Sequence, residues 1–367
     1  MITMLPERIA ALSAATHALC DRLFFVQRVE GDTVIPEPMA PWVARNFGGV
    51  ERVRRQTIVR VVNRFTLEGA LFNPLRALRP AGVAVTDADL DSWIASELEA
   101  VDLFARPLHD TTADLFGRIQ GRFCVSASNV AKYDRWHGLV IFDEPHPLRF
   151  DRERLADYLD VALRWIAAAQ SQDAHAIYPM ITWNCLPRSG ATIAHGHLQM
   201  SLARDMHYSR IEAWRRAALH YGGAERYFSD LATVHDELDL SLPGAHDAQI
   251  FVHLTPLRNR ETVVLSPVVP GDARLAERLA ALLYPILRAL IDDQGVRSFN
   301  MGIALPPIAA PVEHWRGMPV MTRIADRGPA LSVRNDWGAM ELYATGCITT
   351  DPFQIAALLR QQMAGYQ

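Results

Sequence analysis

Three polar side chains at alternate positions, His195, His197 and Gln199, form the segment of the sequence best suited to chemistry. On a β-strand alternate residues share a face, so these three would project together while Leu198 and Met200 point to the other side. An imidazole can serve as a metal ligand, an acid–base group or a nucleophile, and a neighbouring carboxamide can donate a hydrogen bond to a phosphoryl oxygen. The simpler interpretation is a surface strand with incidental histidines, and the spacing alone does not exclude it.

The elements that would hold this segment are predicted from periodicity. Within 151–170 apolar residues, including Leu155, Leu159 and Ile166, recur every three or four positions, which is typical of an amphipathic helix. Short apolar or β-branched runs predict strands at 58–62, 121–128, 137–142, 177–183 and 193–202, with a polar turn at 187–190. A second series follows, with strands at 250–254 and 261–265, a long helix after 272 and a strand at 298–305.

The two series repeat the same order, and each carries an asparagine on its third strand, Asn184 or Asn300, 11 or 14 residues before a histidine. This predicts an α+β fold of two related halves, about 56–235 and 240–350, each an antiparallel sheet with packed helices, fused into one unit. Residues 1–55 are expected to be a helical and loop extension, because helical spacing at 5–23 is followed by three prolines. A C-terminal helix is expected within 351–367.

The composition excludes several classes of protein. Of 367 residues 50% are hydrophobic and 21% charged, which is a globular composition and not a disordered one. The balance of 37 Lys and Arg against 41 Asp and Glu argues against general binding to nucleic acid or to anionic membranes, although a few arginines could still hold one phosphorylated small molecule. The four cysteines are far apart, the first residues do not resemble a signal peptide, and the apolar run at 279–291 is too short to span a bilayer. A cytoplasmic protein is expected.

The segment His-Gly-His-Leu-Gln, with Asn184 eleven residues and Gly190 five residues before His195, resembles the nucleophile segment of one branch of the histidine-triad superfamily. That branch contains the galactose-1-phosphate uridylyltransferases and the diadenosine tetraphosphate phosphorylases. Six further segments are similar to the branch and occur in the same order over about residues 56–360, at 76–80, 143–148, 256–267, 299–302, 314–315 and 338–341. The resemblance implies that the two predicted halves are histidine-triad-like.

The resemblance implies a two-step nucleotidyl transfer. His197 would attack the α-phosphorus of a nucleotide donor and form a nucleotidyl-imidazole, and an acceptor phosphate would then attack the same phosphorus. Gln199 would hold a non-bridging phosphoryl oxygen. Related hydrolases carry a third histidine there, so glutamine favours transfer to phosphate over transfer to water. His195 is included with the catalytic residues.

Several residues are implied as substrate contacts. Arg76 and Arg79 would clamp the donor phosphates, because a guanidinium matches phosphate geometry. Asn184 and the turn residues Ser189, Gly190 and Thr192 would lie near the phosphate, and Lys132, in a Lys-Tyr-Asp segment similar to that of the dinucleotide phosphorylases, could contact one too. Exposed loop charges and an ordinary tight turn are the alternatives for these residues.

The sequence departs from the branch where metals are concerned. Zinc-containing uridylyltransferases have a Cys-x-x-Cys soon after the Arg-Pro segment, whereas residues 80–100 here contain neither Cys nor His. Only His146 and His195 remain of that site, and an iron-like site in the second half would need histidines at Met318 and Val320. Two imidazoles are too few for a closed zinc site, so no structural metal is expected and both histidines should be hydrogen-bonded. Zinc with a ligand from elsewhere, such as His137, is the less favoured alternative.

The resulting hypothesis is a nucleotidyltransferase that takes a nucleotide or nucleotide-sugar donor and a sugar-phosphate or phosphate acceptor. The second half would be degenerate and would supply part of the substrate pocket or a surface of a homodimer. Two alternatives remain open: a phosphorylase of a nucleotide sugar or dinucleotide polyphosphate, and a nucleotide-binding protein that has lost its activity.

Overall fold

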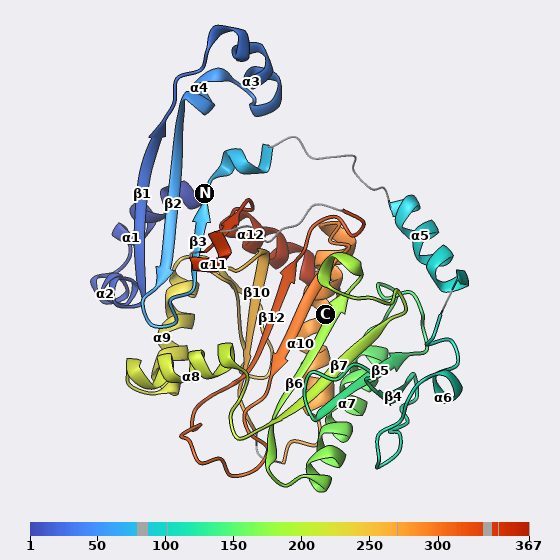
Figure 1. The fold of residues 1–367 in the computed structure, drawn as a ribbon. Helices are drawn as coiled ribbons and strands as arrows, with labels where there is room; N and C mark the ends of the chain where they lie inside the picture. The colour runs from blue at the N-terminus through green and yellow to red at the C-terminus, as the bar shows by residue number, and fades with distance from the viewer. Residues whose placement is uncertain (79–86, 101, 270, 333–339, 344, 367) are drawn as a thin grey trace.

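The computed structural model describes residues 1–78, 87–100, 102–269, 271–332, 340–343 and 345–366 and contains two sheets (Figure 1). The larger sheet has nine strands, each paired antiparallel to its neighbours, in the order β4-β5-β7-β6-β11-β12-β10-β9-β8. Its first four strands come from the first half: β4 (Cys124–Ser128), β5 (Trp136–Phe142), β7 (His197–Arg204) and β6 (Ala176–Cys185). The other five come from the second: β11 (Phe299–Ala304), β12 (Val320–Asp326), β10 (Asn259–Ser266), β9 (Gln249–Val252) and β8 (Ser241–Leu242). The predicted α+β fold, with two antiparallel halves fused into one unit, is confirmed.

The two halves join where β6 pairs with β11, in a register that sets Asn184 opposite Asn300 and Ile181 opposite Ile303. The sequence pattern predicted two sheets but not that they share an edge. Pairing of the two edges satisfies backbone groups that separate sheets would leave open. It also makes one face of the sheet continuous from the first half to the second.

One face of the large sheet is covered by helices. Helix α7 (Arg152–Gln172) begins after Asp151, whose carboxylate accepts a hydrogen bond from the backbone N–H of Arg154 in the N-cap position. It packs against α10 (Leu275–Arg288) and against β4 to β7. Leu198 and Met200 on β7 lie on this face with 0% exposure, as their alternation predicted. The residues between them on β7 therefore face away from α7.

Some of the remaining helices lie around the large sheet and others lie at a distance from it (Figure 1). They are α1 (Leu5–Ala10), α2 (Ala14–Leu23), α3 (Ala40–Phe47), α4 (Val50–Arg54), α5 (Asp87–Ala100), α6 (Pro107–Asp110), α8 (Ser209–Tyr221), α9 (Ala224–Glu237), α11 (Met340–Tyr343) and α12 (Pro352–Gln362). Within the described ranges, no helix has the length and apolar character needed to cross a bilayer.

A smaller sheet of four strands, in the order β1-β2-β3-β13, corrects the expectation of helix and loop over residues 1–55. Strand β1 (Phe24–Asp32) pairs along its whole length with β2 (Arg55–Asn63), and this hairpin extends away from the large sheet with α3 and α4 at its tip (Figure 1). β3 (Gly69–Phe72) pairs with β2, and β13 (Gly346–Ile348) is parallel to β3. β1 is exposed on both faces over much of its length, so it lacks the alternation by which a half-buried strand is recognised.

Candidate active site

His197, the first residue of β7, is held as a neutral imidazole with one free nitrogen. Its ring is 8% exposed, and its Nδ1 lies 2.8 Å from the backbone carbonyl oxygen of His195. A carbonyl oxygen can only accept, so Nδ1 carries the proton and Nε2 keeps its lone pair. Burial lowers the pKa of His197 and outweighs the hydrogen bond to the backbone of His195, which acts to raise that pKa. The side chain therefore has the protonation state of a nucleophile at neutral pH.

The predicted strand at 193–202 begins only at His197, so His195 lies in the segment that leads into β7 and not on the strand with His197 and Gln199. Its Nδ1 is 2.8 Å from a carboxylate oxygen of Asp102, and its Nε2 is 2.9 Å from the carbonyl oxygen of Phe142. With both ring nitrogens facing acceptors, His195 has neither a free lone pair for a metal nor a free nitrogen for attack. Its contribution to the site is its carbonyl oxygen, which orients His197.

Gln199 is oriented by two donors on its side-chain oxygen. Its Oε1 lies 3.0 Å from Nε2 of His137 on β5 and 3.1 Å from the hydroxyl of Tyr133. Burial lowers the pKa of His137, which favours its neutral form. Its Nδ1 accepts from the backbone N–H of Tyr133 at 3.4 Å, which assigns the proton to Nε2 and the donor role toward Gln199 to that nitrogen. The side-chain amide nitrogen of Asn129 also lies 3.2 Å from Nε2. Among the described residues no hydrogen bond uses the amide nitrogen of Gln199. The assignment of oxygen and nitrogen thus leaves an N–H donor on the same strand face as His197.

Lys132 supports this arrangement from the loop between β4 and β5. Its Nζ donates to the hydroxyl of Ser128 at 2.6 Å and to the carbonyl oxygen of His137 at 3.1 Å, and lies 3.6 Å from the buried carboxylate of Asp114. The structure places Lys132 behind His137, where its charge is balanced by Asp114. A phosphate contact would compete with these bonds.

Asn184 and Asn300, which drew attention in the sequence as counterparts, contact each other across the β6–β11 pair. The amide nitrogen of Asn300 donates to Oδ1 of Asn184 at 2.7 Å and to the carbonyl oxygen of Ser189 at 2.9 Å. Arg327, from the second half, donates to Oδ1 of Asn300. The second half thereby fixes the turn that precedes His195.

The turn itself holds three of the predicted contact residues in different settings. Gly190 has a φ of 99°, a left-handed backbone conformation that is unfavourable for residues other than glycine. The hydroxyl of Ser189 donates to the carbonyl oxygen of Leu186 at 2.8 Å, so it closes the turn, and Thr192 is exposed.

Of the two arginines predicted to clamp phosphates, Arg76 is not placed in this cluster. Arg76 is half-buried on the short 3-10 helix Pro74–Leu78, after β3 of the small sheet, and no hydrogen bond or ion pair within the described parts of the chain links it to the His197 segment. Arg79 lies outside the described residues.

His146 and His195, the two histidines that the sequence analysis considered for a metal, make hydrogen bonds. His146 lies 3.2 Å from Asp91 through Nε2 and accepts from the backbone N–H of Leu148 through Nδ1, and burial lowers its pKa. His195 has both nitrogens engaged. In the part of the chain that the structure describes, no three His, Cys, Asp or Glu residues gather as metal ligands, so these residues do not fit a closed zinc site.

Sequence reasoning did not identify Asp102, Phe104 or Tyr133 as part of the site. The ring of Phe104 meets His195 and His197 edge-on, with centroids 5.8 and 5.3 Å away. Asp102 and Phe104 lie more than 90 residues before His195 in a segment without periodicity, so no local signal was present. Tyr133 belongs to the Lys-Tyr-Asp segment described in the sequence analysis, and that segment could have identified it as part of the site.

The fold is similar to that of several solved proteins. An ADP-glucose phosphorylase from Arabidopsis thaliana with bound ADP-glucose superposes with a TM-score of 0.61 at 14% identity, covering 82% of this chain and 97% of the other. A GalT-like protein from the same plant gives 0.57 at 13% identity, covering 72% of this chain and 92% of the other, and a uridylyltransferase gives 0.55 at 14%, covering 68% and 87%. No protein-family model and no curated protein matches the sequence.

At this identity the likeness establishes the fold. This chain therefore shares its fold with the ADP-glucose phosphorylase, the GalT-like protein and the uridylyltransferase.

Proposed function

We propose that the protein is a nucleotidyltransferase that works through a covalent nucleotidyl-His197 intermediate. The observation that carries this proposal is the fixed imidazole: Nδ1–H is bound by the carbonyl oxygen of His195, which leaves Nε2 free at the start of β7. In the first step Nε2 forms a bond to the α-phosphorus of the donor as the bond from that phosphorus to the leaving-group oxygen breaks. In the second, an oxygen of the acceptor phosphate attacks and the phosphorus–nitrogen bond breaks.

The neighbours of His197 suit these steps. When Nε2 bonds to phosphorus the ring becomes positively charged, and the carbonyl oxygen of His195 stabilises that charge through Nδ1–H. The amide of Gln199, held by His137 and Tyr133, can donate to a non-bridging oxygen, where negative charge accumulates in the transition state. A binding protein without activity would have no use for a nucleophile prepared in this way.

A nucleotide-sugar phosphorylase is the second candidate, supported by the likeness to an ADP-glucose phosphorylase. It would use the same first step, and inorganic phosphate would replace a sugar phosphate as the acceptor. The two activities therefore differ only in what attacks the intermediate.

The proposal is tested with donors labelled in the α-phosphate: UTP, ATP, UDP-glucose and ADP-glucose. We expect acid-labile label on the wild-type protein with at least one of them and no label on His197→Ala. His17→Ala, which changes a half-exposed histidine on α2, serves as the control and should label normally. Equal labelling of His197→Ala and wild type would refute the mechanism.

A further inference from the structure

The hydrogen bonds of the buried histidines indicate the charge that each ring carries. A ring nitrogen that accepts a hydrogen bond from a backbone N–H has no proton of its own, so a histidine with such a contact is neutral. The histidines with this contact are His137, His146, His207 and His235. Burial lowers the pKa of each of them, which favours the same neutral form.

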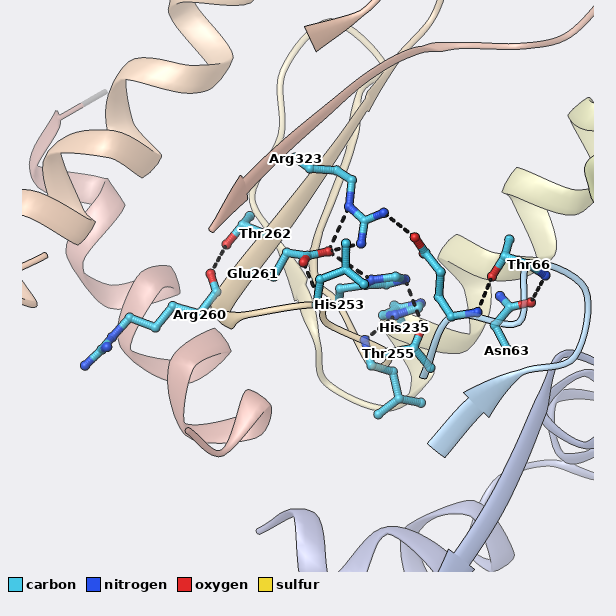
Figure 2. Close-up of polar contacts among 12 residues, drawn as sticks. Asn63, Thr66, His235, His253, Thr255, Arg260, Glu261, Thr262 and Arg323 are labelled. Carbon is cyan, nitrogen blue, oxygen red and sulfur yellow. Dashed lines mark hydrogen bonds and ion pairs between the residues drawn. The ribbon is translucent and has the colours of Figure 1, made fainter. Parts of the chain in front are cut away.

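His253 and Glu261 form a buried pair of imidazole and carboxylate that serves for comparison (Figure 2). Nδ1 of His253 lies 3.3 Å from the carboxylate, and its Nε2 lies 3.4 Å from the hydroxyl of Thr255, which can donate or accept. The same carboxylate is paired with Arg323, so it has a positive partner without a charge on the imidazole. The contacts of His253 therefore do not require a second proton.

His195 differs from these histidines, because both of its ring nitrogens face groups that accept. Nδ1 lies 2.8 Å from the carboxylate of Asp102, and Nε2 lies 2.9 Å from the backbone carbonyl oxygen of Phe142. A carbonyl oxygen cannot donate, so Nε2 carries a proton, and a second proton lies between Nδ1 and the carboxylate. Aspartic acid is a stronger acid than an imidazolium, with ordinary pKa values of about 3.9 and 6.5, so the second proton belongs to the ring.

The carboxylate of Asp102 needs a positive partner, and His195 is in the position to be that partner. The side chains of Asp102 and His195 are only 9% and 5% exposed. The other carboxylate oxygen of Asp102 accepts from the backbone N–H of Phe104 at 2.9 Å. Within the described ranges no lysine or arginine pairs with Asp102, and a buried carboxylate without a counter-ion is strongly destabilising. The two buried charges therefore stabilise each other.

Other charged side chains around His195 have partners of their own. A cavity of about 430 Å³ adjoins His195, and charged or basic residues share its lining. They are Arg106 and His109, which contact Asp110, Arg122, which pairs with Glu153, and Asp143, which pairs with Arg154. Cys124 also belongs to this lining and stays a thiol, because burial raises its pKa. Asp102 thus remains the counter-ion of His195.

A charge on His195 acts on the nucleophile two residues further along the chain. The ring of Phe104 meets both imidazoles edge-on, so His195 and His197 pack around one apolar side chain. Charges interact strongly in such surroundings, where little water screens them. Burial is the largest cause of the lowered pKa of His197; the hydrogen bond to the backbone opposes it, and the charge of His195 lowers that pKa further. An imidazolium at His195 therefore disfavours a proton on Nε2 of His197, the atom that must attack.

We propose that Asp102 holds His195 as an imidazolium, and that this buried ion pair keeps Nε2 of His197 free of a proton. The inference rests on the proposed function and deepens it. Asp102 and His195 are positioning residues that act through His197. Their contacts also join the segment after α5 to the end of β5, which fixes the carbonyl oxygen that binds Nδ1 of His197.

Asp102→Asn tests the charge separately from the geometry. The amide can accept from Phe104 through its oxygen and donate to Nδ1 of His195 through its nitrogen, so the hydrogen bonds are kept while the ion pair is lost. The ring nitrogens are observed by NMR of protein labelled with ¹⁵N in histidine, and the His195 signals are assigned by their loss in His195→Asn. We expect both nitrogens of His195 to carry protons at about pH 7 in the wild type, and only one in Asp102→Asn.

The same spectra follow the titration of His197. In Asp102→Asn its ring should take up a proton at a pH about 0.5 unit higher, because the positive charge that acts on it is lost. The neutral form is then lost earlier as the pH falls. The rate of label formation in the variant, relative to the wild type, should therefore be lowest at acid pH and recover as the pH rises. A purely structural role of Asp102 would lower this ratio equally at every pH.

Asp91→Asn is the matched control, since Asp91 also pairs with a buried histidine, His146, whose other ring nitrogen accepts from a backbone N–H. It should change neither the spectrum of His195 nor the titration of His197.

A single proton on the ring of His195 at about pH 7 in the wild type would overturn the assignment. An unchanged titration of His197 in Asp102→Asn, or an equal shift in Asp91→Asn, would overturn it too. If the spectra agree with the ion pair but no label forms on His197, the ion pair stands and the proposed chemistry fails.

Discussion

At the scale of single residues, the account depends on which nitrogen of His197 is free. The acceptor on Nδ1 is a backbone carbonyl, so its position is set by the turn that ends at His195 and not by another flexible side chain. That turn is fixed by Asn300, and His195 by Asp102 and the carbonyl of Phe142. The nucleophile is therefore positioned by residues that need not contact the substrate.

The lowered pKa of His197 predicts the pH dependence of the first step. Attack needs the neutral ring, and burial places the pKa of His197 below its usual 6.5. The neutral form is lost only as pH falls through that lowered pKa, so label formation should be constant between about pH 6.5 and 8 and decline at lower pH. Rapid-quench rates across this range measure it. A decline already centred above pH 6.5 would show that another group controls the step.

Gln199→Ala should slow both formation and breakdown of the nucleotidyl-enzyme. Removal of one donor to a developing oxyanion typically costs about 10²–10³ in rate. Donor affinity should change less, because the amide contact strengthens only as charge builds. Gln199→His should recover part of the rate and raise the share of intermediate lost to water. Rapid-quench measurement of both half-reactions is the check, and unchanged rates with weaker donor binding would make Gln199 a ground-state contact.

At the scale of elements, prediction succeeded where a segment carries its own periodicity. The burial of Leu198 and Met200 in β7 and of Leu155 and Leu159 in α7 follows from alternation and from helical spacing, and both patterns are local. β1 was missed because its residues are exposed on both faces. Asp102 was missed because its contact with His195 spans 93 residues, and only the tertiary fold creates it.

One prediction concerns Asn300, which lies where β6 of the first half pairs with β11 of the second. Asn300→Ala removes the donor to Asn184 and to the carbonyl of Ser189 and leaves both acceptors without it. We expect a loss of about 1–3 kcal/mol in the free energy of unfolding and a slower first step, since the turn before His195 loosens. Denaturant unfolding measures the first effect. Asn46→Ala, which removes one exposed hydrogen bond on α3, should leave the rate of labelling unchanged; equal effects of the two changes would contradict the role of the join.

At the scale of the whole molecule, the second half completes the first. It contributes Asn300 and Arg327 to the turn before the nucleophile, and residues of β11 and β12 to the lining of a cavity of about 720 Å³. The sequence indicated a degenerate second half and could not show that the two sheets share an edge, because strand pairing across 116 residues leaves no local pattern. This continuity of the sheet places that cavity over β6, β11 and β12, next to the strand that carries His197.

Metal content is a prediction for the whole chain. Purified protein should contain far less than one zinc per chain, because residues 80–100 lack Cys and His and because His195 uses both nitrogens in hydrogen bonds. Elemental analysis after dialysis against a chelator measures it. Stoichiometric zinc that survives this treatment would contradict the description of His146 and His195 as hydrogen-bonded groups.

The most direct test of the central claim is to locate the covalent group. The protein is incubated with the donor that labels it, digested at a pH that preserves phosphorus–nitrogen bonds, and analysed by tandem mass spectrometry. The account predicts a nucleoside monophosphate on the imidazole of His197, which disappears when the acceptor phosphate is added. A nucleotide on any other residue, or a wild-type protein that turns over its donor without a covalent group at His197, would contradict it.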